Sequence, residues 1–485
     1  MRLSHREIIV TLSTCLAFPV AAQSRSPTYT PSKLTANQQL AHDIYKELIE
    51  INTGMKTGNV TPAAQAMATR FRGAGIADSD IFVGGPKPDK YNVVARIHGN
   101  GASGRKPLLL LAHIDVVEAL KADWSPDLDP FVFTERDGYY YGRGTADDKA
   151  MASIFVANAI RMVREHVVPD RDVIIALTAD EEGGGSNGVD WLLKNHPQLV
   201  DAALVINEGG GGTLRNGKPL FNSVQATEKV STNVVLRATN RGGHSSVPRP
   251  DNAIVALADA LSKVGRHQFP VRFNDVTRAF FANTADVEEP TLGRAMKALV
   301  ANPNDAAALA TVASDPRYNS MLRTTCVPTM LSGGHATNAL PQLAEATINC
   351  RVFPSDTPAV IRADIEKLVN DTTVQVVLQG SPRQPPLPSP LQPELFNAVS
   401  RVTRAMWGAV PVIPVMSTGA TDSRFFRALG VASYGVSGLF SDPTVDARAH
   451  GRDERMRIQS YYEGQEFLWR LTRALTTAPG TAAVP

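Results

Sequence analysis

The sequence predicts a two-domain α/β protein in which a small α/β domain is inserted into a larger one. Short, continuous apolar segments alternate with helical patterns through the first half of the chain. Near Glu228 the apolar segments give way to alternating ones, and a proline-rich segment at 381–393 precedes a return of the first pattern. The chain has 485 residues, which is enough for two or more domains or for one domain with a large insertion.

The larger domain is expected to hold a sheet between two layers of helices. Its strand-like segments are YNVVARI (91–97), PLLLLAH (107–113), DVIIALTA (172–179) and AALVINE (202–208), with VPVIPV (410–415) and VASYGV (431–436) late in the chain. Its helical patterns cover about 37–48, 149–165 and 187–194. Because the strands are apolar on both sides and alternate with helices, we expect three layers.

The inserted domain is expected to have two layers. The segment STNVVLRATN (231–240) alternates between apolar and polar residues, which is typical of a strand with one wet face. Further strands are expected at TTCVPTML (324–331), AEATINCRV (344–352) and TVQVVLQ (373–379), with helices at 251–264 and 358–369 and a helical insertion at roughly 270–320. We assign residues 23–228 and 382–485 to the larger domain and 229–381 to the inserted one.

The charge balance points to no polyanionic partner. The chain has 49 basic and 47 acidic residues and a formal net charge of +2. Proteins that bind nucleic acids or acidic membranes usually carry a marked basic excess, so we expect no nucleic acid partner.

Residues 1–22 have the layout of a secretory signal peptide. Two arginines precede a mostly apolar run at 8–20, and a Val-Ala-Ala sequence provides a cleavage site after Ala22. The run is too short for a permanent membrane span, so we expect a periplasmic or secreted protein with no such span. The alternative is a disordered or helical N-terminal extension. A lipoprotein anchor at Cys15 is disfavoured, because Thr14 stands where glycine or alanine would be expected.

Export would leave two cysteines, Cys326 and Cys350. In an oxidising compartment they could pair, since strand-like segments flank both of them, but two buried free thiols fit the sequence equally well. Neither lies in a motif typical of a reactive thiol.

Imidazole and carboxylate side chains gather where the predicted strands end. They are His113, Asp115, Asp147, Asp148, Glu181, Glu182 and Glu208, with His450 in a late loop. Ligands of an open α/β sheet bind beyond the carboxyl ends of its strands, so these positions mark the expected site. Histidine, aspartate and glutamate are the usual ligands of hydrolytic zinc, and three to five of them could hold two ions that share a carboxylate.

Each of these residues taken alone has an ordinary structural explanation. His113 could be a core histidine, the Asp147-Asp148 pair could begin a helix, and Glu181-Glu182 could be a solvated turn. Asp115 lies on the same side of an extended segment as His113, so it could either bind metal or accept the spare ring N–H. It is their joint placement at strand ends that favours a metal site.

The motifs together resemble the zinc exopeptidase and deacylase family. They are AHIDVV, YGRGTADDKA, TADEEGG, NEGG, RGGHSSVP, GGHATNALP and AHGRDER, which occur in the family's order over roughly residues 40–470. Members of this family include glutamate carboxypeptidase, aminoacylase, acetylornithine deacetylase and succinyl-diaminopimelate desuccinylase. GATDSRFF and HGRDER resemble the carboxypeptidase S-like branch most. The resemblance implies a mixed-sheet catalytic domain with an inserted lid and dimerisation domain.

The resemblance also implies the metal ligands and the general base. His113, Asp147 and Glu208 match ligands, with Asp147 as the bridging carboxylate, while Glu182 and His450 match ligands on opposite ions. The implied cofactors are two zinc ions, which cobalt can replace. Asp115 matches an aspartate behind the histidine, and Glu181 matches the base. The family typically has a cis peptide bond at the position of Asp147-Asp148.

The lid contributes further residues in this family. His244 matches a histidine that reaches the site of the neighbouring subunit in a homodimer and polarises the scissile carbonyl. Asn338 and Arg351 match positions that hold the substrate's carbonyl and carboxylate, and Gly419 matches a loop that faces the substrate. Asp453 departs from the family, which more often has asparagine there, and the helical insertion at 270–320 has no obvious counterpart in its compact members.

The function implied is hydrolysis of an amide bond in peptides or N-acyl amino acids with a free carboxylate, as in a carboxypeptidase-type exopeptidase. An N-acyl amino acid deacylase (aminoacylase) or a dipeptidase would use the same site. A binuclear metallophosphoesterase would leave the D-E-E-G glutamate without a role. A catalytically inactive binding protein is disfavoured, because all five ligand positions and the base carry suitable residues.

Overall fold

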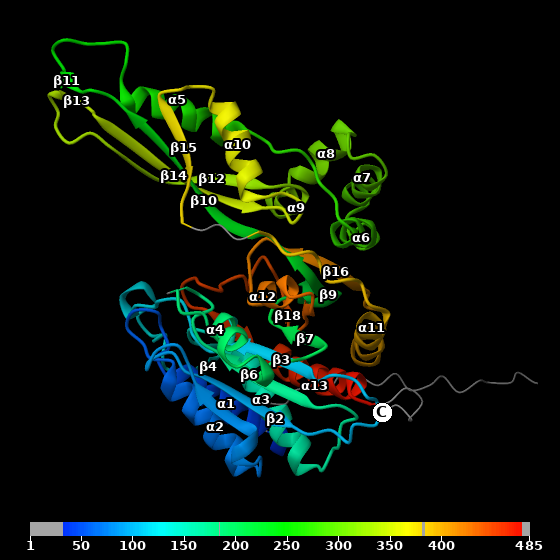
Figure 1. Ribbon diagram of the computed structural model, residues 1–485. Coiled ribbons are helices and arrows are strands. Elements are labelled where there is room, and N and C mark those ends of the chain that lie inside the picture. The colour runs from blue at the N-terminus through cyan, green and yellow to red at the C-terminus, as the bar shows by residue number, and fades with distance from the viewer. Residues whose placement is uncertain (1–32, 184, 381–383, 478–485) are drawn as a thin grey trace, which may run out of the picture.

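The computed structural model describes residues 33–183, 185–380 and 384–477. Figure 1 shows a larger body built on a ten-stranded sheet and a smaller body, above it in that view, built on a four-stranded sheet. The α/β class predicted from the sequence is confirmed. The predicted signal peptide and Cys15 lie outside the described residues. Among those that are described, no helix is both long and apolar enough to cross a membrane.

The large sheet is mixed. Its strands are β1 (Ile81–Gly84), β2 (Asn92–Ile97), β6 (Val173–Thr178), β3 (Leu108–His113), β7 (Leu204–Asn207), β17 (Ala432–Gly435), β9 (Lys218–Glu228), β8 (Gly211–Arg215) and β18 (Phe440–Ser441) in spatial order, with β16 (Val412–Ser417) also paired to β9. The central strands β6, β3, β7 and β17 are parallel. Antiparallel pairings on both sides of them make the sheet mixed.

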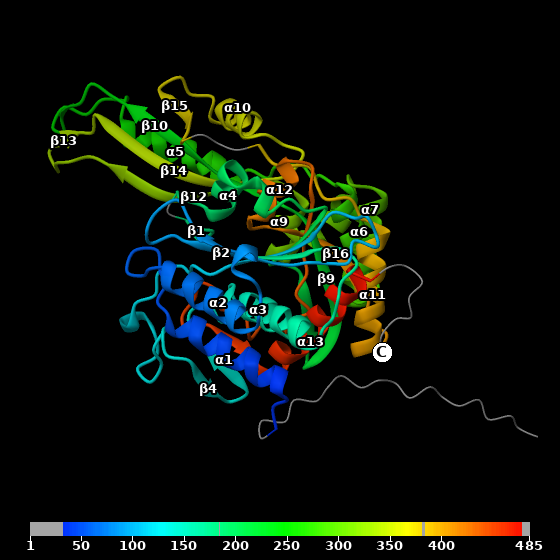
Figure 2. The ribbon, with the colours of Figure 1, turned by 60° about the horizontal axis from the view of Figure 1, so that its bottom comes forward.

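Helices cover both faces of this sheet, which confirms the three layers (Figure 2). One face packs against α1 (Ala36–Glu50), α2 (Thr61–Gly73), α3 (Lys149–Arg164), α11 (Pro393–Trp407) and α13 (Ile458–Leu475), and the other against α4 (Gly188–Asn195) and α12 (Ser423–Ala428). Along β3, Leu108 and Leu110 lie in the first core, whereas Leu109 and Leu111 lie in the second. The continuous apolar run in the sequence therefore reflects a strand buried on both sides.

Short elements complete the larger body. They are a small antiparallel sheet of β19 (Arg455–Arg457), β5 (Tyr139–Tyr141) and β4 (Thr134–Arg136), and 3-10 turns at Asp78–Asp80, Lys121–Asp123 and Pro197–Leu199. The small sheet joins the C-terminal segment that follows His450 to the segment that precedes Asp147. It thus brings two distant parts of the chain together beside the predicted site.

The smaller body is a four-stranded antiparallel sheet with helices on one face. Its strands are β12 (Thr325–Gly333), β14 (Leu343–Val352), β10 (Val230–Thr239) and β15 (Val374–Leu378) in spatial order, and its helices are α5 (Ala253–Arg266) and α10 (Pro358–Val369). Alternate residues of β10, such as Val234 and Leu236, pack under the helices. A hairpin of β11 (Gly243–His244) and β13 (Ala339–Leu340) extends from the end of this body that lies away from the larger one (Figure 1).

The helical insertion packs on the larger body, although its sequence lies inside the predicted inserted domain. It forms α6 (Asp275–Thr284), α7 (Pro290–Ala301), α8 (Ala306–Ala313) and α9 (Pro316–Leu322). Phe280 and Phe281 of α6 share a core with Phe221 of β9 and with Ile413 and Met416 of β16. These shared contacts bury the apolar side of the helices against the large sheet.

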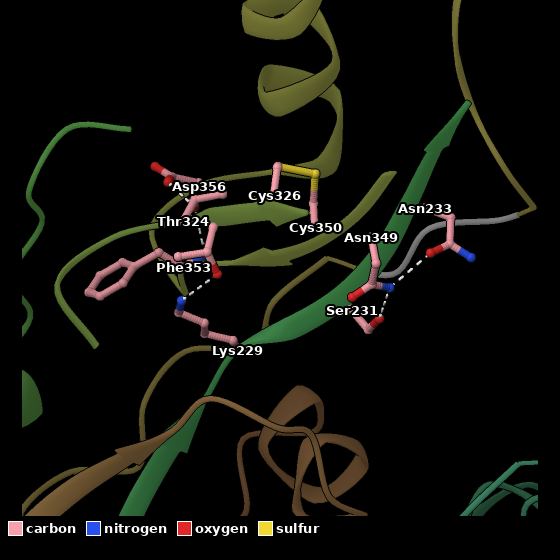
Figure 3. Close-up of a disulfide and its surroundings, with 10 residues drawn as sticks. Lys229, Ser231, Asn233, Thr324, Cys326, Asn349, Cys350, Phe353 and Asp356 are labelled. Atoms are coloured by element: carbon pink, nitrogen blue, oxygen red, sulfur yellow. Dashed lines mark hydrogen bonds between the residues drawn. A yellow bond between two sulfur atoms is a disulfide. The ribbon is translucent and has the colours of Figure 1, made fainter. Parts of the chain in front are cut away.

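A disulfide joins Cys326 of β12 to Cys350 of β14, which are directly opposite each other in the ladder (Figure 3). Of the two alternatives that the sequence left open, pairing is the one observed. Their Cα atoms are 4.1 Å apart, and Cys350 is fully buried. The bond therefore links the edge strand of the smaller sheet to its neighbour.

Candidate metal and catalytic site

The predicted ligands converge because three neighbouring parallel strands end at the same edge of the sheet. β3 ends at His113, β6 is followed by the D-E-E-G turn, and β7 is followed by Glu208. Asp147 comes from the turn before α3, and His450 from the loop before β19. Five chain segments thus contribute residues to the site. Four of them contribute one residue each, and the D-E-E-G turn contributes Glu181 and Glu182.

Two groups of three possible ligand atoms share Asp147. In the first, His113 Nε2 lies 3.0 Å from Asp147 Oδ1 and 3.6 Å from Glu208 Oε2. In the second, His450 Nε2 lies 3.1 Å from Asp147 Oδ2 and 2.9 Å from Glu182 Oε1. The atoms of each group lie within 4.8 Å of one another. The two oxygens of Asp147 therefore face different groups, as a bridging carboxylate requires.

Glu182 and His450 belong to the same group. This contradicts the expectation that they hold opposite ions. The reason is that the D-E-E-G turn after β6 and the loop of His450 lie on the same side of Asp147, whereas the end of β7 lies on the other side.

Asp115 supports the site without entering either group. Its backbone carbonyl lies 3.0 Å from His113 Nδ1, while its carboxylate is 3.7 Å from that nitrogen. The carboxylate instead accepts the backbone N–H groups of Glu181 and Glu182, each at 3.1 Å. Of the two roles considered for Asp115, metal binding and acceptance of the His113 ring N–H, the structure shows the second, through the backbone carbonyl. The Asp115 carboxylate holds the backbone of the D-E-E-G turn. With Nδ1 protonated, His113 presents Nε2 as a free lone pair.

The D-E-E-G turn is sharp enough to send its two glutamates to different partners. Asp180 has a φ of 63° and Gly183 a φ of 142°, both in the region that favours glycine. Glu182 contacts His450, whereas Glu181 belongs to neither ligand group and lines a cleft. The Asp147–Asp148 peptide is cis, as the resemblance implied.

A buried ion pair behind the ligands was not predicted. Arg143 Nη1 donates to Glu454 at 2.6 Å, and Glu454 also accepts the backbone N–H groups of Ala146 and Asp147 at 2.7 and 3.1 Å. Arg143 donates in turn to the carbonyl of Gly451 at 3.1 Å. Arg143 lies in the motif YGRGTADDKA and Glu454 in the motif AHGRDER. The presence of opposite charges in these two motifs was the feature of the sequence from which an ion pair could have been predicted.

Asp453, the departure from the family, has a local structural role. It accepts hydrogen bonds from the backbone N–H of Ser125 at 2.9 Å and from the Ser125 hydroxyl at 2.6 Å. It therefore fixes the 121–125 segment against the loop of His450 and does not approach the ligand groups.

Burial and neighbouring charged groups shift the pKa values of Asp147, His450 and Glu208. Burial would raise the pKa of the Asp147 carboxyl, but hydrogen bonds with His113 and His450 outweigh it and hold that pKa below its usual range. Hydrogen bonds with Asp147 and Glu182 raise the pKa of His450 to about 10. Burial raises the pKa of Glu208 to about 7 despite the opposing effect of His113.

The pKa of Glu181 is raised well above its usual value by burial and then by the negative charges of Glu208 and Asp422. The site therefore concentrates carboxylates that repel one another in a buried place. Divalent cations would supply the missing positive charge, and the donor set of imidazole nitrogen and carboxylate oxygen suits zinc. The residues fit two metal ions.

Two of the lid residues predicted from the resemblance, His244 and Asn338, lie away from this site within a single chain. His244 and Asn338 are exposed on the β11–β13 hairpin, where the N–H of Ser245 donates to the carbonyl of Asn338 at 3.0 Å (Figure 1). The backbone N–H of Ser246 donates to His244 Nδ1 at 3.1 Å. This bond favours the tautomer with a proton on Nε2, which can donate to a carbonyl.

Arg351 lies on β14 of the smaller body, and Gly419 lies in the loop between β16 and α12 of the larger body. Arg351 is half-buried on β14, opposite Ser231 of β10 and Thr325 of β12. Gly419 precedes Ala420, which lines the same cleft as Glu181, and a side chain at Gly419 would meet little more than the hydroxyl of Ser417.

Comparisons with known proteins agree with this geometry. A family model described as Peptidase family M20/M25/M40 matches residues 109–474. The human N-fatty-acyl-amino acid synthase/hydrolase PM20D1 is 28% identical over 484 residues, which cover 95% of each chain. Probable carboxypeptidase S-like 2 of Dictyostelium discoideum is 28% identical over 84% of this chain and 83% of its own. An M20 family metallo-carboxypeptidase from Sulfolobus solfataricus has the same fold, with a TM-score of 0.69 at 19% identity over 90% of this chain and 99% of its own.

Proposed function

Because this chain belongs to the M20/M25/M40 peptidase family, and is therefore a hydrolase, we propose that it is a dinuclear zinc enzyme. Its reaction would be hydrolysis of the amide bond between an acyl or peptidyl group and an amino acid with a free carboxylate. The observation that carries this proposal is the position of Asp147, whose two oxygens lie 3.0 and 3.1 Å from His113 and His450. Such a carboxylate is suited to hold two ions at once.

The ligands would divide into two sets around Asp147. His113 and Glu208 would complete one set, and Glu182 and His450 the other. When bound, the two ions supply Lewis-acid chemistry and the positive charge that favours ionisation of water. Cobalt has a similar preference for these donors, so it is expected to replace zinc.

Glu181 would act as the general base that transfers the proton of the attacking water. It stands beside the ligands but outside both groups, and it lines the cleft open to substrate. Its position beside both ligand groups suits a carboxylate that takes a proton from the attacking water and returns it to the leaving nitrogen. Asp115 holds the backbone of Glu181 in place.

The lid would complete the site in a homodimer. Asn338 and Arg351 are proposed to hold the substrate, and His244 of a second copy is proposed to donate to the scissile carbonyl. The exposed apolar surface of the smaller body supports pairing: Val327, Met330 and Leu331 on edge strand β12 are 59, 68 and 70% exposed. An unpaired edge strand with such side chains is well suited to pair with another chain.

Export to the periplasm or beyond is part of the proposal. The Cys326–Cys350 bond supports an oxidising compartment, where disulfides form and persist. Residues 1–22 have the composition of a signal peptide.

The substrate could be an N-acyl amino acid or a peptide. The name of the human relative, which matches 95% of this chain, favours the former, and the carboxypeptidase S-like relative favours the latter. Both are amides of an amino acid with a free carboxylate, so one site serves either substrate.

The experiment is hydrolysis by the purified protein of a panel of dipeptides and N-acyl amino acids, with and without a chelator. Glu181→Gln should keep its metal and lose about 10²–10⁴-fold in kcat, whereas Glu182→Gln should also lose metal. Metal content is measured by atomic emission after dialysis. A fully active Glu181→Gln enzyme would show that another residue moves the proton, and activity that resists a chelator would refute the metal mechanism.

A further inference from the structure

The N-terminal helix α1 packs next to the turn that carries Asp147. It lies against α3, which begins at Lys149, directly after the Asp147–Asp148 pair (Figure 2). No residue of α1 belongs to either ligand group. Two buried side chains nevertheless connect α1 to this turn, one on each side of Asp147 in the sequence.

Lys149 connects the turn to the C-terminal end of α1. Its side chain is fully buried, and its Nζ donates to the carbonyls of Leu48 and Ile51 at 2.8 and 2.9 Å. The last carbonyls of a helix have no partner within the helix, so an ammonium group is favourable there. Gly144 leaves room for this side chain, because a Cβ at Gly144 would lie 2.9 Å from Lys149 Cδ. The residue two positions after Asp147 is thus tied to α1.

Tyr45 connects the turn to α1 before Asp147. Its hydroxyl donates to the carbonyl of Thr145 at 2.5 Å, and the whole side chain is buried. Its ring stacks on Tyr461, with the centroids 4.5 Å apart, which holds the ring in place. Residues 145 and 149 are therefore both anchored on α1, and Asp147 lies midway between them in the sequence.

The segment after α1 also contacts the strand end that carries His113. The N–H of Val116, three residues after His113, donates to the carbonyl of Thr53 at 3.3 Å, and Gly54 forms a parallel bridge with Val116. α1 and its continuation therefore contact both of the segments that meet where His113 Nε2 lies 3.0 Å from Asp147 Oδ1.

We propose that Tyr45 and Lys149 are positioning residues that set the place of the bridging carboxylate Asp147 relative to His113, an inference that rests on the proposed function. A carboxylate shared by two ions has to present one oxygen to each of them. A shift of its backbone therefore disturbs metal binding even when every ligand is present.

This support complements the buried ion pair of Arg143 and Glu454. Glu454 accepts the N–H of Asp147, and Arg143 donates to the loop of His450, so that pair relates Asp147 to His450. The contacts of α1 relate Asp147 to His113 in the same way. Each oxygen of Asp147 would thus have its own support.

The alternative is that both contacts only stabilise the fold. A capped helix end and a buried hydroxyl bond contribute to stability wherever they occur. Such a role would lower the free energy of unfolding and leave the metal affinity of the folded protein unchanged. A positioning role changes the metal affinity and the turnover of protein that is still folded, which separates the two.

The test compares Tyr45→Phe and Lys149→Met with the wild type. Tyr45→Phe removes one hydroxyl and keeps the buried ring, so it decides the question if Lys149→Met does not fold. Tyr318→Phe is the matched control, because it removes a buried hydroxyl that donates to Glu288 at 2.6 Å, outside both ligand groups. Competition with a chromophoric chelator measures zinc affinity, and the visible spectrum of the cobalt-loaded protein reports the ligand geometry. Urea unfolding in the presence of chelator measures the stability of the fold alone.

We expect at least one of the two zinc ions to bind about tenfold more weakly to Tyr45→Phe and about 10–100-fold more weakly to Lys149→Met, with altered cobalt spectra. With a substrate that the wild type hydrolyses, kcat should fall about tenfold and KM should change little, because both side chains are fully buried and cannot touch the substrate. Tyr318→Phe should lose stability and keep the zinc affinity, spectrum and kinetics of the wild type.

Wild-type zinc affinity and an unchanged cobalt spectrum in a folded Tyr45→Phe would overturn the inference and leave these contacts as elements of the fold. An equal loss of zinc affinity in Tyr318→Phe would overturn it too, because any loss of stability would then be sufficient. Neither measurement needs turnover. A wild type that binds two ions and hydrolyses nothing therefore counts against the proposed function alone.

Discussion

Arg143 and Glu454 form a buried ion pair, 2.6 Å apart, that ties the loop of Asp147 to the loop of His450. Glu454 accepts N–H groups from the first loop, and Arg143 donates to carbonyls of the second. This ion pair thus helps to hold Asp147 and His450, which are far apart in the sequence, in their relative position.

Glu454→Gln should weaken metal binding while it leaves all five ligands in place. A neutral amide presents an N–H₂ group where the carboxylate accepted several hydrogen bonds, so both loops relax. Loss of a group that orients ligands typically costs about 10–100-fold in metal affinity. Competition with a chromophoric chelator measures this, and Glu366→Gln, which removes an exposed acid on α10, is the control. Unchanged metal affinity would show that the loops hold their positions independently.

Lys229→Met should stabilise the protein at low pH. Lys229 is fully buried with its Nζ 3.3 Å from the Thr325 hydroxyl, and burial, aided by the charges of Arg351 and Arg323, lowers its pKa from 10.5 to about 7 (Figure 3). Between pH 7 and 10.5 the unfolded chain binds more protons at Lys229 than the folded chain does, so the free energy of unfolding rises with pH. Below pH 7 the buried ammonium lowers the free energy of unfolding by its full amount.

We expect Lys229→Met to gain about 1–3 kcal/mol in free energy of unfolding at pH 6, with the gain shrinking towards pH 10. Urea unfolding at both pH values measures it, and Lys297→Met on the surface should show no such trend. If the variant is less stable than the wild type at pH 6, the contacts of the Lys229 ammonium stabilise the folded protein by more than its burial destabilises it.

Replacing both Cys326 and Cys350 by alanine should lower the free energy of unfolding by about 3 kcal/mol, because their bond closes a loop with a sequence separation of 24. Chemical denaturation measures the loss. Dithiothreitol should destabilise the wild type and leave the double variant unaffected. If the reductant affects both equally, it acts elsewhere than at this bond.

Leu331→Asp should yield a monomer with little activity. In the proposed homodimer, a charge on the exposed edge strand β12 would oppose pairing, and His244 would then have no second site to enter. Light scattering after gel filtration gives the mass, and Val360→Asp, an equally drastic change at an exposed site on α10, should stay dimeric. A wild-type protein that is itself an active monomer would remove the role proposed for His244.

The sequence predicted most of what depends on local pattern. Helix α10 matches its predicted bounds, because Thr357 caps its first turn and Asn370 ends it in the left-handed region at a φ of 44°. Strand β3 begins one residue later than predicted, and β6 is one residue shorter than predicted at each end. The rule that strand ends meet at one edge predicted that His113, the D-E-E-G turn and Glu208 lie together.

Contacts between distant segments could not be predicted in this way. The pairing of Glu182 with His450 depends on how a loop 268 residues later folds back. The packing of α6 on β16 depends on which of two sheets has a free apolar face. The roles of Arg143 and Lys149 depend on what each side chain meets, and a basic residue in a motif does not reveal that.

The insertion of α6–α9 has a mechanical consequence for the smaller body. After α5 the chain leaves that body to build a helical block on the large sheet, and it returns only at β12. The two bodies are therefore joined by two more covalent crossings than a simple inserted domain would need. A rotation of the small sheet relative to the large one would have to bend four such crossings instead of two. The two extra crossings therefore leave the smaller body with less rotational freedom than a domain attached at two points.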